Sequence, residues 1–156
     1  MRRPREIITK TKLAQQGFGK AAEEFCGPAS VAMALDLAGR QLSVREVVDK
    51  MSQNRAFIKG KGTILSRVPN YFRGFIYLPF IPTRLLILLL KMNFVFVHSI
   101  RRDDSGAGHL VCICGYKEGM IYFCDSNQDD EALRRMSIGQ WNKLSNRRAL
   151  GIRMIQ

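Results

Sequence analysis

Three side chains far apart in the chain have the types needed for thiol-based catalysis: Cys26, His109 and Asp125. A cysteine attacks carbonyl carbon as its thiolate, and it needs a neighbouring base that a third group holds in one tautomer. Cys26 directly precedes Gly27 and an apolar run, 28–38, which predicts a buried helix ending before Gly39. The dipole of that helix would favour negative charge on the sulfur, and Gly27 would leave room for a substrate carbonyl. Taken alone, however, such a cysteine is more often a small buried hydrophobic residue.

The spacing of His109 and Asp125 makes the catalytic interpretation stronger. His109 begins an apolar run that continues to Tyr116, and a second run, 120–124, ends directly before Asp125. Glu118 and a following glycine separate the two runs, which predicts a β-hairpin. A hairpin brings the start of its first strand beside the end of its second, so His109 and Asp125 are expected to meet. The alternative is an exposed histidine at a strand start and an aspartate in a turn.

The elements that must position these residues follow a helices-then-strands order. Ser43 is expected to begin a second helix, with Glu46 completing a capping box. Thr83 is expected to cap a helix that runs to Met92. Further expected elements are a short helix at 63–72, strands at 75–78, 93–100, 110–116 and 120–124, a helical turn or two at 137–144, and a last strand at 151–155. Together they predict an α+β domain in which N-terminal helices pack on an antiparallel β-sheet.

Composition limits the possible classes of protein. The 156 residues suit one domain with a hydrophobic core, and we expect a basic arm at 1–19 followed by a single domain at 20–156. Apolar residues at 46% argue against disorder, and the formal net charge of +12 argues against an acidic protein. That charge favours an anionic partner, such as an acidic protein or peptide substrate. The arginine pairs are scattered without interleaved aromatic residues, so a nucleic-acid partner is not favoured.

The apolar stretches are too short for a membrane span. The longest unbroken run after the prolines is Leu85–Leu90, and a spanning helix needs roughly 20 residues. The N-terminus is charged and lacks the apolar run of a signal peptide. We therefore expect a cytoplasmic protein as made, with export by a route independent of a signal peptide as the alternative.

Two other groups of residues have a structural explanation that we favour. His109, Cys112, Cys114 and Cys124 are all of zinc-binding type, but strand alternation places Cys112 and Cys114 on one face and His109 on the other. Buried core thiols are therefore expected, with no metal or organic cofactor. His98 alternates with two phenylalanines, which indicates a packed rather than a catalytic histidine.

The sequence resembles papain-fold peptidases related to the bacteriocin-processing, double-glycine leader peptidases. The run Cys26-Gly-Pro-Ala-Ser-Val-Ala-Met-Ala-Leu is similar to the nucleophile helix of that family. The runs Gly108-His-Leu-Val-Cys-Ile-Cys-Gly-Tyr and Gly119-Met-Ile-Tyr-Phe-Cys-Asp are similar to its histidine and aspartate strands, and the resemblance covers about residues 20 to 145. It implies a papain-like fold with Cys26 as nucleophile, His109 as general base and acid, and Asp125 as the residue that orients the histidine.

The chain departs from the family pattern at two positions. The family has a glutamine about six residues before the cysteine that donates to the oxyanion, and Lys20 stands there in this chain. Gln16 is the candidate replacement, with the Cys26 amide as a second donor. Ser126 also follows Asp125 where the family usually has proline.

The expected function is a cysteine hydrolase that cleaves peptide bonds, acting as a free-standing enzyme without an attached transporter, for example as a delivered effector or toxin. Two alternatives stay open. The same three residues also support glutamine deamidation or acyl transfer, and the loss of the oxyanion glutamine would suit a non-catalytic papain-like binding module.

Overall fold

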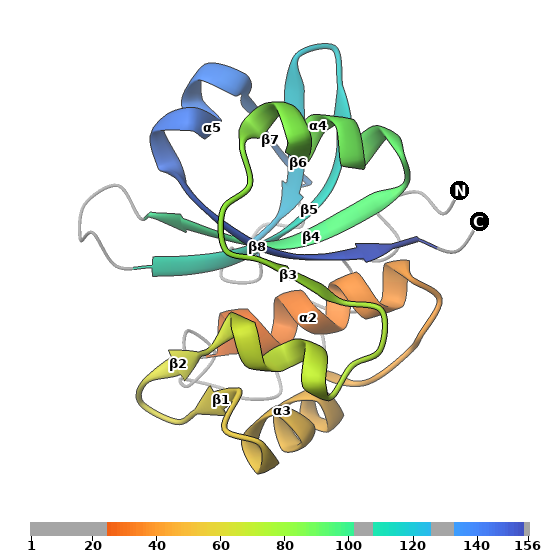
Figure 1. Ribbon diagram of the computed structural model, residues 1–156, viewed down its shortest axis with the longest axis vertical. Coiled ribbons are helices and arrows are strands. Elements are labelled where there is room, and N and C mark those ends of the chain that lie inside the picture. The colour runs from red at the N-terminus through yellow and green to blue at the C-terminus, as the bar shows by residue number, and fades with distance from the viewer. Residues whose placement is uncertain (1–24, 102–107, 126–132, 155–156) are drawn as a thin grey trace.

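A six-stranded antiparallel sheet separates two layers of helices (Figure 1). The computed structural model describes residues 25–101, 108–125 and 133–154. Within these ranges the strand order is β3-β8-β4-β5-β6-β7, and every neighbouring pair is antiparallel. The strands are β3 (Ile76–Leu78), β4 (Phe94–Arg101), β5 (Gly108–Lys117), β6 (Met120–Cys124), β7 (Arg134–Ser137) and β8 (Ser145–Arg153). The α+β class predicted from the sequence is confirmed.

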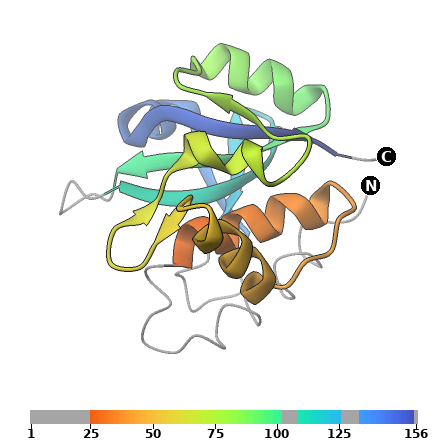
Figure 2. The ribbon, with the colours of Figure 1, turned by 60° about the horizontal axis from the view of Figure 1, so that its bottom comes forward.

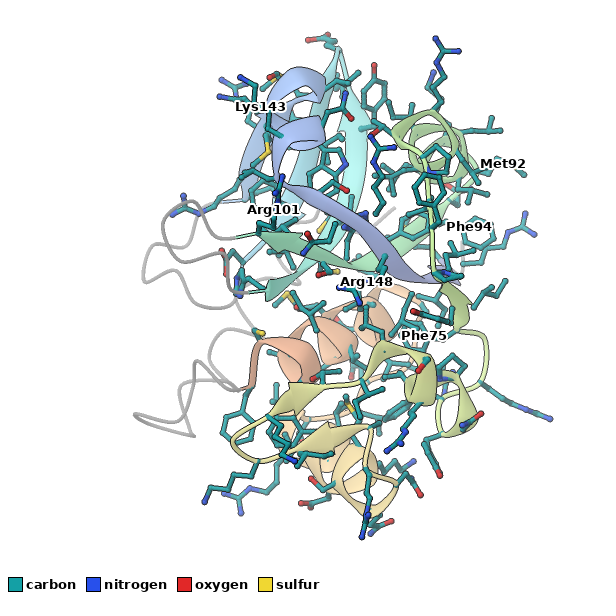
Figure 3. All side chains as sticks on the ribbon, turned by 60° about the vertical axis from the view of Figure 1, so that its left-hand side comes forward. Phe75, Met92, Phe94, Arg101, Lys143 and Arg148 are labelled. Carbon is teal, nitrogen blue, oxygen red and sulfur yellow. The ribbon has the colours of Figure 1, made fainter. Side chains whose placement is uncertain are left out.

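Helices cover both faces of this sheet. On one face lie α2 (Cys26–Leu37), α3 (Val44–Gln53), the 3₁₀ helix η2 (Leu65–Asn70) and a small sheet of β1 (Phe57–Ile58) and β2 (Gly62–Thr63). On the other lie α4 (Thr83–Lys91) and α5 (Ile138–Leu144). Each face has its own hydrophobic core, and Figure 3 shows Phe75 on the α2 side and Phe94 on the α4 side. The sheet is therefore buried on both faces.

Helix α2 is the buried helix that the sequence predicts. It lies between the sheet and α3 (Figure 2), and all nine residues from Gly27 to Leu35 are buried. A helix that is apolar on every side needs such a central position. It begins at Cys26, two residues before the predicted start, and Gly39 follows its end with φ 83°. Cys26 is consequently the first residue of the helix.

Of the two predicted helix caps, Ser43 is confirmed and Thr83 is wrong. The Ser43 side chain accepts from the Glu46 amide as expected, but the Glu46 carboxylate accepts from the Ser43 hydroxyl and not from its amide. Thr83 is the first residue of α4 and not its cap, because its hydroxyl bonds Asn142 Oδ1 of α5 at 2.5 Å. A reciprocal capping box forms instead at Ser137, the cap of α5.

The strands match their predicted positions best in the hairpin. Strands β5 and β6 pair as expected, and Glu118 and Gly119 both have positive φ, as a two-residue type I′ turn requires. The last strand is longer than predicted: it begins at Ser145, directly after α5, and lies centrally between β3 and β4. The sequence did not indicate the first half of this strand, because that half contains the exposed basic pair Arg147-Arg148. The buried part of the strand begins only at Ala149 and runs to Ile152.

No helix in the described ranges is long and apolar enough to cross a membrane. The basic arm expected at 1–19, together with Gln16, Lys20 and Ser126, lies outside the described residues.

Candidate active site

His109 and Asp125 meet at one end of the β5–β6 hairpin. Cys112 pairs with Cys124, so continuing the register places Asp125 opposite Val111 and His109 two residues further along β5. Such diagonal neighbours are within reach of long side chains. The His109 Nε2 atom lies 2.7 Å from Asp125 Oδ1, and the two side chains are only 4% and 10% exposed. The hairpin thus forms the predicted contact between them.

Cys26 reaches the same histidine from the helical layer. The Cys26 thiol, half-buried at the first turn of α2, lies close enough to His109 to raise the pKa of that ring. Because Nε2 is engaged by Asp125, Nδ1 is the ring nitrogen left for the thiol. The structure therefore brings the three side chains predicted from the sequence into one chain of contacts, Cys26 to His109 to Asp125.

A hydrogen bond that the sequence did not suggest fixes α2 against β5. Ser30, one turn into α2, donates its hydroxyl to the Leu110 carbonyl at 3.2 Å. Leu110 directly follows His109, so this bond holds the helix that carries the thiol against the strand that carries the imidazole. Ser30 is fully buried within an apolar run, and a buried serine among alanines was the only signal that the sequence offered.

The hairpin of β1 and β2 lies against the start of α2 (Figure 2). A Cβ atom added to Gly27 would lie 1.9 Å from Thr63 Oγ1, so only glycine fits beside Cys26 at this approach. The Thr63 hydroxyl is buried and has no hydrogen-bond partner within the described residues. The close contact explains why a glycine follows the candidate nucleophile: it makes room for β2.

The environment of His109 favours its charged form. Burial lowers the pKa of His109, but hydrogen bonds and charge interactions with Asp125 and Cys26 outweigh burial and raise it to about 9. An imidazolium at neutral pH beside a thiol stabilises negative charge on the sulfur and holds a proton ready for a leaving group. The amide groups at the start of α2 also lack partners within the helix and can donate to an oxyanion.

The second histidine is packed and neutral. His98 is fully buried, with its ring centroid 4.7 Å from that of Trp141 in an edge-to-face arrangement. Its Nδ1 donates to the Ser99 carbonyl at 2.9 Å. Burial lowers the pKa of His98 to about 4, only partly offset by that bond. This agrees with the packed role predicted from its alternation with phenylalanines.

The three remaining cysteines lie in the core on the α2 side of the sheet. Cys112, Cys114 and Cys124 are buried and free of disulfides. Among the described residues, no group of three or more His, Cys, Asp or Glu side chains is arranged to hold a metal ion. The core position that strand alternation predicted for Cys112 and Cys114 is confirmed.

Comparison with solved structures identifies the fold. The chain superposes on the peptidase domain of Streptococcus ComA, a bi-functional ABC transporter involved in a quorum-sensing pathway, with a TM-score of 0.62 and 16% identity over 83% of this chain and 91% of that domain. It also matches a C39-like peptidase from Bacillus anthracis, with a TM-score of 0.60 and 13% identity over 88% of this chain and 91% of that one. No protein-family model and no curated protein sequence matches the chain. The resemblance to bacteriocin-processing peptidases is thus confirmed in the fold, which is that of C39 peptidases.

Proposed function

We propose that this protein is a cysteine peptidase that hydrolyses an amide bond of a peptide or protein substrate through Cys26, His109 and Asp125. The observation that carries the proposal is the position of the His109 ring, which contacts the Cys26 thiol and the Asp125 carboxylate at once. Three separate elements supply these groups, and an imidazole between a thiol and a carboxylate is the arrangement that nucleophilic catalysis by cysteine requires. The C39 peptidase fold of the chain supports the same proposal.

In the proposed mechanism each side chain has one task. Cys26 Sγ attacks the substrate carbonyl carbon, and backbone amides at the start of α2 stabilise the resulting oxyanion. The His109 imidazolium then donates its proton to the departing amine, and the C–N bond breaks to leave a thioester on Cys26. His109, now neutral, removes a proton from water, the hydroxide attacks the thioester, and the carboxylic acid leaves as the thiolate re-forms.

Asp125 acts on the ring and not on the substrate. Its carboxylate accepts from Nε2–H, which keeps Nδ1 directed at the sulfur and stabilises the charged ring. The surface charge suggests which substrates are favoured: a chain with a net charge of +12 attracts acidic peptides over basic ones. We extend the proposal to acidic protein or peptide substrates on that basis.

Selective alkylation tests the proposal without knowledge of the substrate. The protein is treated with iodoacetamide at pH 6, and the rate of carbamidomethylation at each of the four cysteines is followed by peptide mass spectrometry. Cys26 should react at least about 10-fold faster than a small free thiol, because a thiol beside a charged imidazole and a helix N-terminus is activated for attack. The matched variant His109→Ala should remove that advantage. A Cys26 that reacts no faster than the free thiol would overturn the proposal.

A second assay identifies the reaction. Acidic and basic peptide pools are incubated with the protein, with Cys26→Ala as the inactive control, and the products are weighed by mass spectrometry. Cleavage adds the mass of one water across two fragments, whereas deamidation of glutamine raises the mass of an intact peptide by about 1 Da. Peptide fragments that appear with the wild type and not with the control support the peptidase. Intact deamidated peptides would assign the three residues to a deamidase.

A further inference from the structure

Three thiols that take no part in the proposed catalysis lie close together on β5 and β6, next to Asp125 in the chain. Cys112 and Cys114 lie on β5 and Cys124 lies on β6, directly opposite Cys112. The register shifts between Ile113 and Gly115, and the strand irregularity includes Cys114. The Cys114 and Cys124 sulfur atoms are 2.9 Å apart, and the Cys114 thiol also donates to the Cys112 carbonyl at 3.4 Å. Cys114 is therefore the central thiol of the group.

We propose that Cys114 and Cys124 form an oxidative modification site, which a peroxide converts to a disulfide that weakens the hold of Asp125 on His109. The first part of the proposal depends only on the two thiols. The second part, control of the catalytic residues, rests on the proposed function. Nothing in the catalytic cycle above uses either thiol, so the pair is available for a separate role.

The geometry requires only a small movement to form the bond. A disulfide has a sulfur–sulfur distance of about 2.05 Å, so the two atoms must approach by less than about 1 Å. The two residues lie on neighbouring hydrogen-bonded antiparallel strands, with Cys124 opposite Cys112 and Cys114 two residues further along β5. The irregular register at Cys114 gives β5 a place to adjust, because the ladder is already interrupted there.

Cys114 has the features of the thiol that is oxidised first. It is the most accessible of the three, at 8% exposure against 2% for Cys124 and 0% for Cys112. Hydrogen bonds from the Cys112 and Cys124 thiols lower the pKa of Cys114 well below its usual value and outweigh the effect of burial. The pKa values of its two neighbours are raised by the same contacts. A thiol whose pKa is lowered, with a second thiol in contact beside it, is the combination that disulfide formation uses.

The chemistry balances with hydrogen peroxide as the oxidant. The Cys114 thiolate attacks one peroxide oxygen, the O–O bond breaks, and with one proton the products are a sulfenic acid and water. The Cys124 thiol then attacks the sulfenic sulfur, forms the S–S bond and releases a second water. Two thiols lose two electrons in total, and one peroxide is reduced to two waters.

The consequence for the site follows from chain position. Cys124 directly precedes Asp125, whose carboxylate lies 2.7 Å from His109 Nε2. Pulling Cys124 toward Cys114 moves the backbone that carries Asp125, and a charge-assisted hydrogen bond of this length weakens when its partners separate. Because Asp125 is the main support of the charged ring, oxidation should lower the pKa of His109.

Mass spectrometry tests the modification itself. The protein is prepared as Cys26→Ala, so that the proposed nucleophile does not consume oxidant, and is treated with a few equivalents of hydrogen peroxide. The expected product is about 2 Da lighter, with the peptides containing Cys114 and Cys124 joined until dithiothreitol is added. Adding Cys112→Ala should preserve the product, and adding Cys114→Ala should abolish it. A disulfide that includes Cys112, oxidation of Cys114 only to sulfinic acid, or no loss of 2 Da would overturn the assignment.

Histidine titration by NMR tests the link to Asp125 in the same Cys26→Ala protein. The chain has two histidines, and His98 serves as an internal control because its ring packs on Trp141 and its Nδ1 donates to the Ser99 carbonyl. On oxidation the pKa of His109 should fall by about one unit or more, while that of His98 stays constant. A disulfide with an unchanged His109 pKa would overturn the regulatory part alone. Failure of the proposed function is seen separately, as an unreactive Cys26 in the reduced wild-type protein.

Discussion

Substitution of Asp125 by asparagine isolates the support that its charge gives to His109. Asparagine keeps the size of the side chain and an oxygen that can accept from Nε2, but it removes the negative charge. Burial remains and continues to lower the pKa of His109, opposed only by Cys26 and by the uncharged amide oxygen of the new side chain. Asp125 acts more strongly than Cys26 both by hydrogen bonding and by charge. The pKa of His109 should therefore fall from about 9 by at least about one unit.

The same shift predicts a change in stability. The gap between 6.5 and about 9, at about 1.4 kcal/mol for each pKa unit, corresponds to about 3 kcal/mol of preference for the charged ring in the folded state. Because the pKa is raised on folding, this contribution is fully present below pH 6.5 and is lost as the pH rises through about 9. The Asp125→Asn variant should lose about half or more of that pH-dependent contribution.

Two measurements examine this prediction. NMR titration of the His109 ring gives its pKa in both proteins, and urea unfolding at pH 6 and pH 9 gives the free energies of unfolding. Comparing the wild type with the variant at each pH cancels the groups that titrate equally in both. A His109 pKa that stays near 9 in Asp125→Asn would refute the reasoning, since the raised value would then not depend on the carboxylate.

Other substitutions examine the remaining contacts. Cys26→Ala should abolish peptide cleavage while changing the free energy of unfolding by no more than about 0.5 kcal/mol, since the side chain is only half-buried. Gly27→Ala should destabilise the fold by about 1–3 kcal/mol, because the new methyl group meets Thr63, and the penalty should shrink when Gly27→Ala is made in a Thr63→Gly protein. The lowered pKa of His98 gives stability that is present above pH 6.5 and is lost as the pH falls toward 4. Between pH 7 and pH 5 the free energy of unfolding, measured with urea, should therefore fall by about 2 kcal/mol less in His98→Gln than in the wild type.

The residues that form the site could be predicted because each carries its signal locally. Cys26 precedes an apolar run, and the hairpin that joins His109 to Asp125 is signalled by two apolar strands and a Glu-Gly turn. A hairpin converts local sequence into a contact between residues sixteen positions apart, because the turn sets the register. Only the approach of α2 to this hairpin depended on the resemblance to a known family.

The contacts that the sequence did not predict all join distant segments through small or polar groups. Thr63 against Gly27, Ser30 on the Leu110 carbonyl and Thr83 on Asn142 have no periodic pattern that would indicate them. The sequence predicted Thr83 as a helix cap because the same hydroxyl can serve a cap or a tertiary hydrogen bond. In the structure this hydroxyl donates to Asn142 of α5 instead. Arg101 is similar: it donates to the Lys143 carbonyl and so joins the end of β4 to α5 (Figure 3), while its sequence position suggests only a solvated arginine pair.

The two histidines show why local sequence alone does not assign a role to a titratable residue. Both lie in apolar strands, and burial lowers the pKa of both. His98 is surrounded by the Trp141 ring and neutral polar groups, so burial determines its pKa and the imidazole is neutral above about pH 4. His109 has a carboxylate at 2.7 Å, so charge decides and the ring is protonated below about pH 9. The contribution of His98 to the free energy of unfolding decreases as the pH falls below 6.5, and that of His109 decreases as the pH rises above 6.5. The combined contribution of the two rings is therefore greatest near pH 6.5, where a charged His109 and a neutral His98 coexist.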